Sequence, residues 1–167
     1  KELRFAYNKL YTLPESIGNM QNVTYCNFTN NNLRSLPAEI TQLNKCTKID
    51  LANNRFSSMP ESLSRMESLK ELDLSGNNIK KVTSSIEQFQ YLTHLNLSNN
   101  AIYSLSRDLG KLSNLEELNL SRNEILVIPD QLDGMKNLKT LNLSYNNLYN
   151  SQKKKVKKLL PQTEIAL

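Results

Sequence analysis

The apolar and polar positions of this chain recur with a period of 23 residues. An asparagine marks the same place in every period without any insertion or deletion, at Asn8, Asn31, Asn54, Asn77, Asn100, Asn123 and Asn146. Self-similarity at a fixed period of about 20–50 residues is the sequence signature of a repeat architecture, in which each unit packs only against its neighbours. The chain is therefore predicted to form a solenoid of seven stacked units.

The first half of each unit predicts a short strand. Apolar residues stand five and three positions before the asparagine, as Leu72 and Leu74 do before Asn77. This alternation has period two, so one face is buried and the residues between point outward. The asparagine then offers a donor and an acceptor to the turning backbone. Stacked asparagines are expected to form a buried ladder, and each lost amide would cost about 1–3 kcal/mol.

The second half of each unit predicts one or two helical turns. Apolar pairs are spaced three residues apart, at Ile17/Met20, Ile40/Leu43, Leu63/Met66, Ile86/Phe89, Leu109/Leu112 and Leu132/Met135. Four units place a proline just ahead of this segment, where its missing N–H is not needed. Thr83 and Ser106 replace the proline in the other two units. We expect those two units to be looser on that side, but not differently folded.

The repeating unit resembles the 23-residue leucine-rich repeat of the type LxxLxLxxNxLxxLPxxIxxLxx, found in Ras-group repeat proteins of animals and plants and in bacterial repeat proteins such as those of spirochaetes. The resemblance extends from Leu3 to Leu148. It implies an α/β leucine-rich repeat solenoid, a curved right-handed superhelix. The parallel β-sheet would line its concave side, and short α or 3₁₀ helices would cover its convex side.

The two ends of the pattern differ. We expect residues 1–150 to form the repeat array, with an incomplete first unit, and residues 151–167 to form a basic capping helix and tail. Val156, Leu159 and Leu160 would share the buried face of that helix. At the other end, Leu3 and Phe5 would lie near an open edge that earlier repeats, a missing cap or a partner would cover.

The positive charge of the chain belongs to the predicted cap. The whole chain has a net charge of +5, and its last 17 residues contribute +4 through five lysines and Glu164. These lysines are Lys153, Lys154, Lys155, Lys157 and Lys158. They form either a solvated helix face or a weak electrostatic contact with an acidic partner or a membrane surface. No basic stripe follows the array, so specific nucleic-acid binding is not expected.

The outward residues of the strands are the candidate binding surface. Seven strands would make a sheet about 29 Å long, enough for one side of a standard protein interface of about 800 Å². Aromatic and arginine residues dominate interface hot spots. The predicted partner-binding residues are Tyr25, Lys48, Glu71, His94, Glu117, Arg122 and Tyr145. The alternative is a solvated polar face, with binding elsewhere.

The residues give no sign of catalysis or of a cofactor. The chain lacks a P-loop, a Gly-x-Ser-x-Gly elbow, a His-Glu-x-x-His motif and a Cys-x-x-Cys pair. His94 is the sole histidine and has no metal-ligand spacing around it. Cys26 and Cys46 occupy repeat core positions, so buried free thiols are favoured over a disulfide or a metal site. We expect no enzyme activity, no metal and no cofactor.

These features predict a protein–protein interaction module, of the kind used in scaffolds and signalling. The alternative is the recognition arm of a larger signalling or effector protein whose catalytic domain lies upstream. Asn96, Asn119 and Asn142 each begin an Asn-Leu-Ser sequon on the predicted concave face. Glycans there would cover the binding sheet, which favours the cytoplasm, with a secreted bacterial protein as the alternative.

Overall fold

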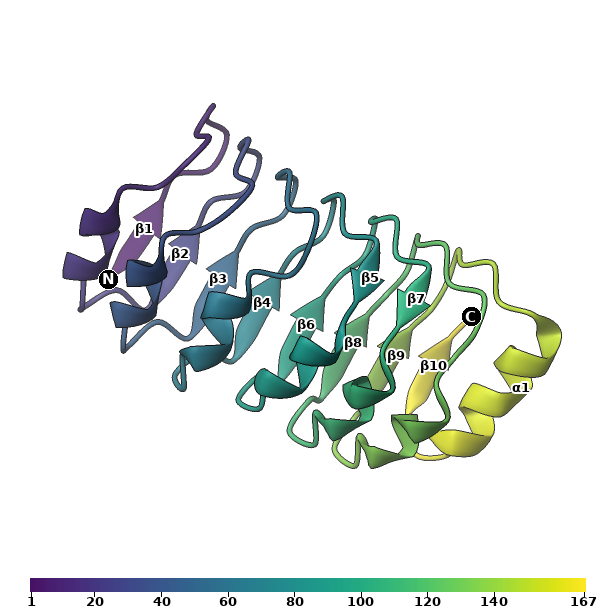
Figure 1. Cartoon of the computed structure of the whole chain (residues 1–167). Helices are drawn as coiled ribbons and strands as arrows, with labels where there is room; N and C mark the ends of the chain where they lie inside the picture. The colour runs from purple at the N-terminus through teal and green to yellow at the C-terminus, as the bar shows by residue number, and fades with distance from the viewer.

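The computed structural model describes every residue from Lys1 to Leu167 and forms a curved row of stacked coils (Figure 1). Eight parallel strands line one side: β1 (Glu2–Arg4), β2 (Tyr25–Asn27), β3 (Lys48–Asp50), β4 (Glu71–Asp73), β6 (His94–Asn96), β8 (Glu117–Asn119), β9 (Thr140–Asn142) and β10 (Glu164–Ala166). They pair in the order of the sequence. The 23-residue period therefore maps directly onto neighbouring strands.

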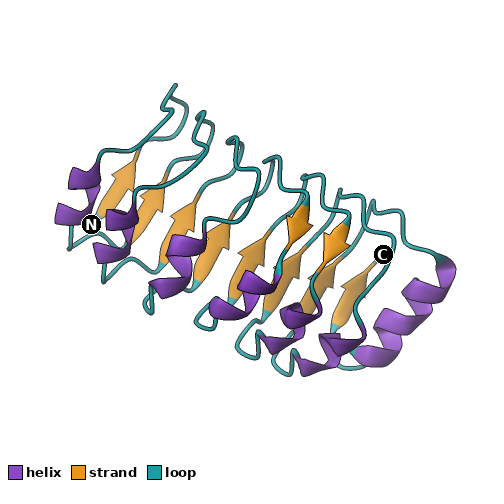
Figure 2. Cartoon of the chain, in the orientation of Figure 1, coloured by secondary structure: helices purple, strands orange, loops and turns teal.

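The opposite side carries six short 3₁₀ helices (Figure 2). They are η1 (Glu15–Asn19), η2 (Ala38–Gln42), η3 (Glu61–Arg65), η4 (Ser84–Gln88), η5 (Arg107–Lys111) and η6 (Asp130–Gly134). Pro14, Pro37, Pro60 and Pro129 stand at the N-cap positions of four of them. This arrangement confirms the predicted leucine-rich repeat solenoid, with every convex helix of the 3₁₀ kind.

One continuous apolar core lies between the two layers and contains 41 buried side chains. The inward residues of the strands form one wall, as Leu72 and Leu95 do, and the 3₁₀ helices supply the other through residues such as Leu63. Phe28 and Phe56 are the largest side chains that are fully buried. Because every strand turns only its middle residue inward, its two flanking residues remain available to solvent on the concave face.

Six repeat asparagines form a ladder of hydrogen bonds between neighbouring units, but only Asn31, Asn54, Asn77 and Asn123 are buried as expected. Asn77 donates from Nδ2 to the carbonyls of Leu74 in its own unit (2.9 Å) and Leu51 in the preceding unit (3.0 Å). Its Oδ1 accepts from the N–H of Phe56 at 3.0 Å. The first rung differs, because Asn8 is exposed and bonds only to carbonyls of its own unit. Each inner asparagine therefore joins two units.

The two units without proline are built differently on the convex side, contrary to the expectation that only their tightness would change. Here the strands β5 (Lys81–Val82) and β7 (Ser104–Leu105) form a second small parallel sheet. The N–H of Ser106 donates to the carbonyl of Val82 at 2.8 Å, a bond that a proline could not make. The Ser106 hydroxyl also accepts from the N–H of Asp108 and so caps η5. Replacing proline by Ser106 thus allows an additional backbone hydrogen bond between these two units.

The C-terminal segment closes the core in two ways. The helix α1 (Asn150–Leu159) buries Val156 completely. The segment expected to be a tail then forms β10, which pairs with β9 and places Ile165 opposite Leu141. The last turn therefore extends the sheet by one strand.

The N-terminal end has no such cover. The edge of β1 that faces away from β2 is unpaired. Leu3 is partly buried, and Phe5 is 41% exposed although its ring stacks on that of Phe28 at 6.3 Å. The structure thus places Leu3 and Phe5 at an open edge, as the sequence predicts. No helix of the fold has the length and apolar character needed to cross a membrane.

Candidate protein-binding surface

The concave side of the sheet is hollowed between β3 and β10, over a volume of about 440 Å³. The flanking residues of six strands line this hollow: Lys48, Asp50, Glu71, Asp73, His94, Asn96, Glu117, Asn119, Thr140, Asn142, Glu164 and Ala166. The period-two alternation of each strand places them there, since the residue between them is turned into the core. We call this surface the concave hollow.

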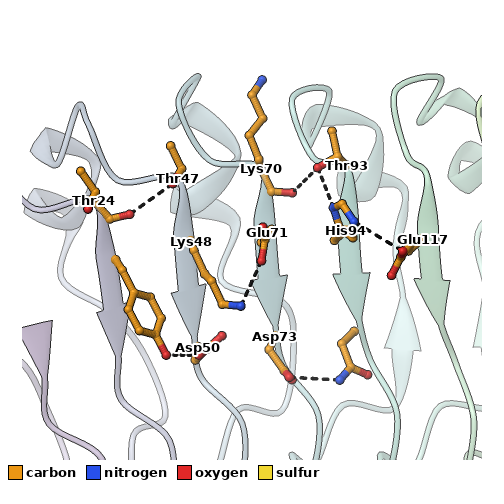
Figure 3. Close-up of polar contacts among 12 residues, drawn as sticks. Thr24, Thr47, Lys48, Asp50, Lys70, Glu71, Asp73, Thr93, His94 and Glu117 are labelled. Carbon is orange, nitrogen blue, oxygen red and sulfur yellow. Dashed lines mark hydrogen bonds and ion pairs between the residues drawn. The ribbon is translucent and has the colours of Figure 1, made fainter. Parts of the chain in front are cut away.

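Polar and charged side chains contact one another across the strands of the concave hollow (Figure 3). Lys48 Nζ on β3 lies 3.0 Å from Glu71 Oε2 on β4. Two strands further on, His94 Nε2 lies 3.6 Å from Glu117 Oε1, and the other ring nitrogen contacts the Thr93 hydroxyl at 2.8 Å. These pairs are exposed, so each contributes little to folding stability and can be exchanged for contacts with a partner.

A second line of polar contacts runs closer to the C-terminal ends of the strands. The hydroxyl of Tyr25 donates to Asp50, and Asn96 donates from Nδ2 to Asp73 Oδ2 at 3.0 Å (Figure 3). Hydrogen bonding to the carboxylate of Glu71 raises the pKa of Lys48 above its usual range. Burial, and then the hydrogen bond to Asp50, raise the pKa of Tyr25. At neutral pH the lysine is therefore charged and the tyrosine protonated.

Several residues of this second line shape the backbone. In five strands the side-chain oxygen accepts from the N–H two residues later, at Asn27, Asp73, Asn96, Asn119 and Asn142. Such local bonds stabilise the turn that follows the strand. The amide Nδ2 groups of Asn119 and Asn142 have no partner within the protein, and both residues line the hollow. They remain free to donate to a bound molecule.

Arg122 and Tyr145 form a separate pair beyond the strand ends, outside the concave hollow. The guanidinium of Arg122 lies 4.7 Å from the centre of the Tyr145 ring, and Tyr145 is 74% exposed. Both residues have left-handed backbones, with φ of 55° and 58°. Tyr7 shares this conformation in the first unit, whereas Asn30, Asn53, Gly76 and Asn99, of types that tolerate it, occupy the same place in the remaining units. Large side chains are thus displayed here against the local backbone preference.

The predicted binding residues fall into three groups. Lys48, Glu71, His94 and Glu117 line the concave hollow together. Tyr25 lies on β2, beside Lys48 and Asp50 but outside the hollow. Arg122 and Tyr145 make the rim pair.

Sequence reasoning omitted Asp50, Asp73, Thr140 and Glu164 from the site, although all four line the hollow. The repeat period marks the first three as outward residues. Glu164 had no such mark, because β10 stands one residue out of the 23-residue period.

The two cysteines and one of the terminal lysines, Lys155, are part of the fold. Cys26 and Cys46 are free and fully buried, as predicted, with their sulfurs 3.8 Å apart. The contact with Cys46, together with burial, raises the pKa of the Cys26 thiol. Lys155 is committed to the cap, since it donates to the carbonyl of Ile128 at 2.7 Å and pairs with Asp130 at 2.5 Å. No three histidine, cysteine or acidic side chains converge as metal ligands would.

Comparison with known proteins supports the same architecture. A family model described as leucine rich repeat matches residues 27–79, 45–102 and 90–148. A leucine-rich repeat protein of Leptospira interrogans is similar over 100% of this chain and 54% of its own, with 28% identity and a TM-score of 0.63.

An internalin of Listeria monocytogenes is similar over 99% of this chain and 46% of its own, with 20% identity and a TM-score of 0.80. This chain therefore spans about half the length of both solved structures. No curated protein matches it.

Proposed function

This chain belongs to the leucine-rich repeat family, whose repeats generally serve as protein-interaction modules; from that premise we propose that it is a non-catalytic module that binds another protein on its concave sheet. The observation that carries the proposal is the concave hollow, which gathers outward side chains from six consecutive strands on one surface. Specific binding needs several such positions to contact one partner at the same time.

The dimensions of the sheet fit this role. Eight strands at about 4.8 Å spacing give a face about 34 Å long, and a standard interface uses about 800 Å² from each partner. The polar pairs of the hollow, such as Lys48 with Glu71, are exposed and weak. A partner can therefore exchange them for its own contacts at small cost.

The rim pair adds an anchor beside the hollow. Arginine and tyrosine are enriched at interface hot spots because they combine a large contact area with hydrogen bonding. Arg122 and Tyr145 also keep a left-handed backbone that disfavours side chains of their size. A residue held against its local preference is a candidate for a functional role.

The proposal is tested with binding partners captured from cells that produce the protein. The rim variant Arg122→Asn/Tyr145→Asn removes the anchor and gives the backbone a residue that suits it, so its folding stability is maintained or rises. The hollow variant is Lys48→Ala/His94→Ala/Glu117→Ala. The control, Glu61→Ala/Gln131→Ala/Lys136→Ala, changes three exposed convex residues.

We expect the hollow variant to lower affinity for a captured partner by about tenfold or more, and the convex control to leave it unchanged. The proposal fails if the convex control loses the partner while both concave variants retain it.

A further inference from the structure

The concave hollow carries a regular row of carboxylates. Glu71, His94, Glu117, Thr140 and Glu164 are direct Cα partners across β4, β6, β8, β9 and β10. Every second residue of this line is a glutamate. Because the intervening residues are His94 and Thr140, the three carboxylates are separated by two strand steps each. Parallel strands lie about 4.8 Å apart, so the acids repeat at about 9.6 Å.

The surrounding face reinforces this negative potential. Among the outward flanking residues of the eight strands, six are acidic and two are basic, so the face has a net charge of −4 with His94 neutral. The whole chain is +5, and its remaining residues therefore carry the positive charge. From β6 to β10 no lysine or arginine lines the hollow. The carboxylates of Glu117 and Glu164 thus have no cation opposite them except a protonated His94.

The spacing of the row selects a conformation for its partner. A polyproline II helix has three residues per turn and a rise of about 3.1 Å per residue, so every third side chain returns to one face at about 9.3 Å. An extended β-strand returns at about 6.7 Å, and a helical i, i+7 spacing is about 10.5 Å. The curvature of a concave sheet brings its side-chain tips slightly closer than the strands themselves, which moves the row toward the polyproline value.

The backbone of such a segment also finds donors in the hollow. A polyproline II chain has no internal hydrogen bonds, so its carbonyls are free acceptors. The Nδ2 groups of Asn119 and Asn142 lack acceptors in the protein and stand beside the acidic row, one residue beyond the buried position of β8 and β9. Their oxygens are held by the turns, so their amino groups have a fixed direction.

We propose that the concave hollow accepts an extended cationic segment of a partner protein in polyproline II conformation, with lysine or arginine at every third residue facing Glu71, Glu117 and Glu164. This inference rests on the proposed function and specifies the chemistry of the partner. Lys48, which pairs with Glu71 on the β3 side, limits the cationic stretch at that end. The segment therefore lies over β4 to β10 and crosses the strands.

The experiment uses two fluorescein-labelled peptides of identical composition with the full chain. The first is four Lys-Pro-Pro triplets, and the second, KPKPKPKPPPPP, places its lysines at every second residue. Proline holds both peptides extended before binding. The acid variant is Glu71→Gln/Glu117→Gln/Glu164→Gln. Its control, Glu15→Gln/Glu39→Gln/Glu61→Gln, removes the same charge from the first turns of η1, η2 and η3 on the convex side.

Fluorescence anisotropy should show the triplet peptide binding several-fold more tightly than the alternating one. The acid variant should weaken the triplet peptide roughly tenfold, as the loss of three exposed ion pairs implies, and the convex control should leave it within about twofold. Equal binding of both peptides, or an equal loss in both variants, would overturn the inference and indicate charge attraction without register.

Failure of this inference is distinguishable from failure of the proposed function. A captured native partner that depends on the hollow, together with no preference for the triplet peptide, rejects the cationic segment and retains the concave interface. Loss of the native partner only on convex substitution rejects both.

Discussion

The first and the last strand of this chain differ in what covers the apolar core beside them. At the C-terminus, α1 buries Val156, and β10 pairs with the last repeat strand. The side chain of Gln152 accepts from the N–H of Ile128 at 3.0 Å. At the N-terminus, β1 has an open edge, Phe5 is partly exposed and Asn8 bonds only within its own unit. Within residues 1–167, the last unit is therefore covered on its outer side, whereas the outer side of β1 is open.

The comparison teaches that stability in this fold depends on having a neighbour on both sides. The contribution of an asparagine or a leucine to folding stability depends on whether a neighbouring unit packs against it. Stability should therefore rise from the first unit inward and remain high to the cap. Matched substitutions in the first unit and further along the array test this gradient.

The largest difference is expected within the asparagine ladder. Asn77→Ala removes bonds to three carbonyls and one N–H, of which the Leu51 carbonyl and the Phe56 N–H belong to the preceding unit, and should lower the free energy of unfolding by about 3 kcal/mol. Asn8→Ala removes bonds from an exposed side chain and should cost less than about 1 kcal/mol. Urea unfolding followed by circular dichroism measures both. Equal losses would contradict the role of the neighbouring unit.

The next difference compares a leucine at each end. Leu160→Ala opens a cavity under the cap, where the side chain is buried, and should cost about 2–3 kcal/mol. Leu3→Ala acts at the partly covered open edge and should cost about 1 kcal/mol. The same unfolding experiment applies. A larger loss from Leu3→Ala would mean that the first unit anchors the array.

A smaller effect should appear in thiol reactivity. Cys26 and Cys46 lie in the second and third units and are fully buried. A thiol reagent can therefore label them only when these units open locally. If the array frays from its open end, Leu3→Ala should accelerate labelling about fivefold under native conditions, and Leu160→Ala should not. Stopped-flow absorbance with an aromatic disulfide reagent gives the rates. Equal acceleration by both variants would indicate opening of the whole domain.

The smallest expected effect is on the thermal stability of the protein at acidic pH. Contact with Lys111 lowers the pKa of Asp108, and contact with Lys139 lowers that of Glu116, both in the C-terminal half. A carboxyl whose pKa is lower in the folded state stabilises the fold above its unfolded pKa, and this contribution disappears as pH falls through the folded value. Between about pH 5 and 3, Lys111→Met/Lys139→Met should therefore lose less thermal stability than the parent. If the melting temperatures of the variant and the parent fell equally between pH 5 and 3, these two ion pairs would not contribute to stability.

The architecture was predictable because each rule involves one unit and its neighbour. The period placed the strands, the helical turns and the asparagine ladder, since these depend on local alternation and a single amide. The strand β10 was missed because Ile165 and Leu167 follow Leu141 and Leu143 by 24 residues. Because of this one-residue offset the segment does not match the 23-residue pattern, although it still pairs with β9 as a repeat strand would.

The candidate site was less predictable because it depends on side-chain direction. The period shows that Lys48 points outward, but its pairing with Glu71 is set by rotamers and by the distance between strands. One signal in the sequence was available. The residue four places before the repeat asparagine is Asp or Asn in six consecutive units, at Asn27, Asp50, Asp73, Asn96, Asn119 and Asn142. Those types bond the backbone two residues later, so a structural role could have been expected.

Site-specific photo-crosslinking tests the concave interface most directly. A photoreactive phenylalanine analogue is placed at Thr140 inside the concave hollow, or at Gln131 on η6 of the convex side, and the chain is irradiated in cells. The account predicts that Thr140 yields a discrete crosslinked partner, which the variant Arg122→Asn/Tyr145→Asn diminishes, and that Gln131 yields none. A discrete partner crosslinked through Gln131, with none through Thr140, would contradict it.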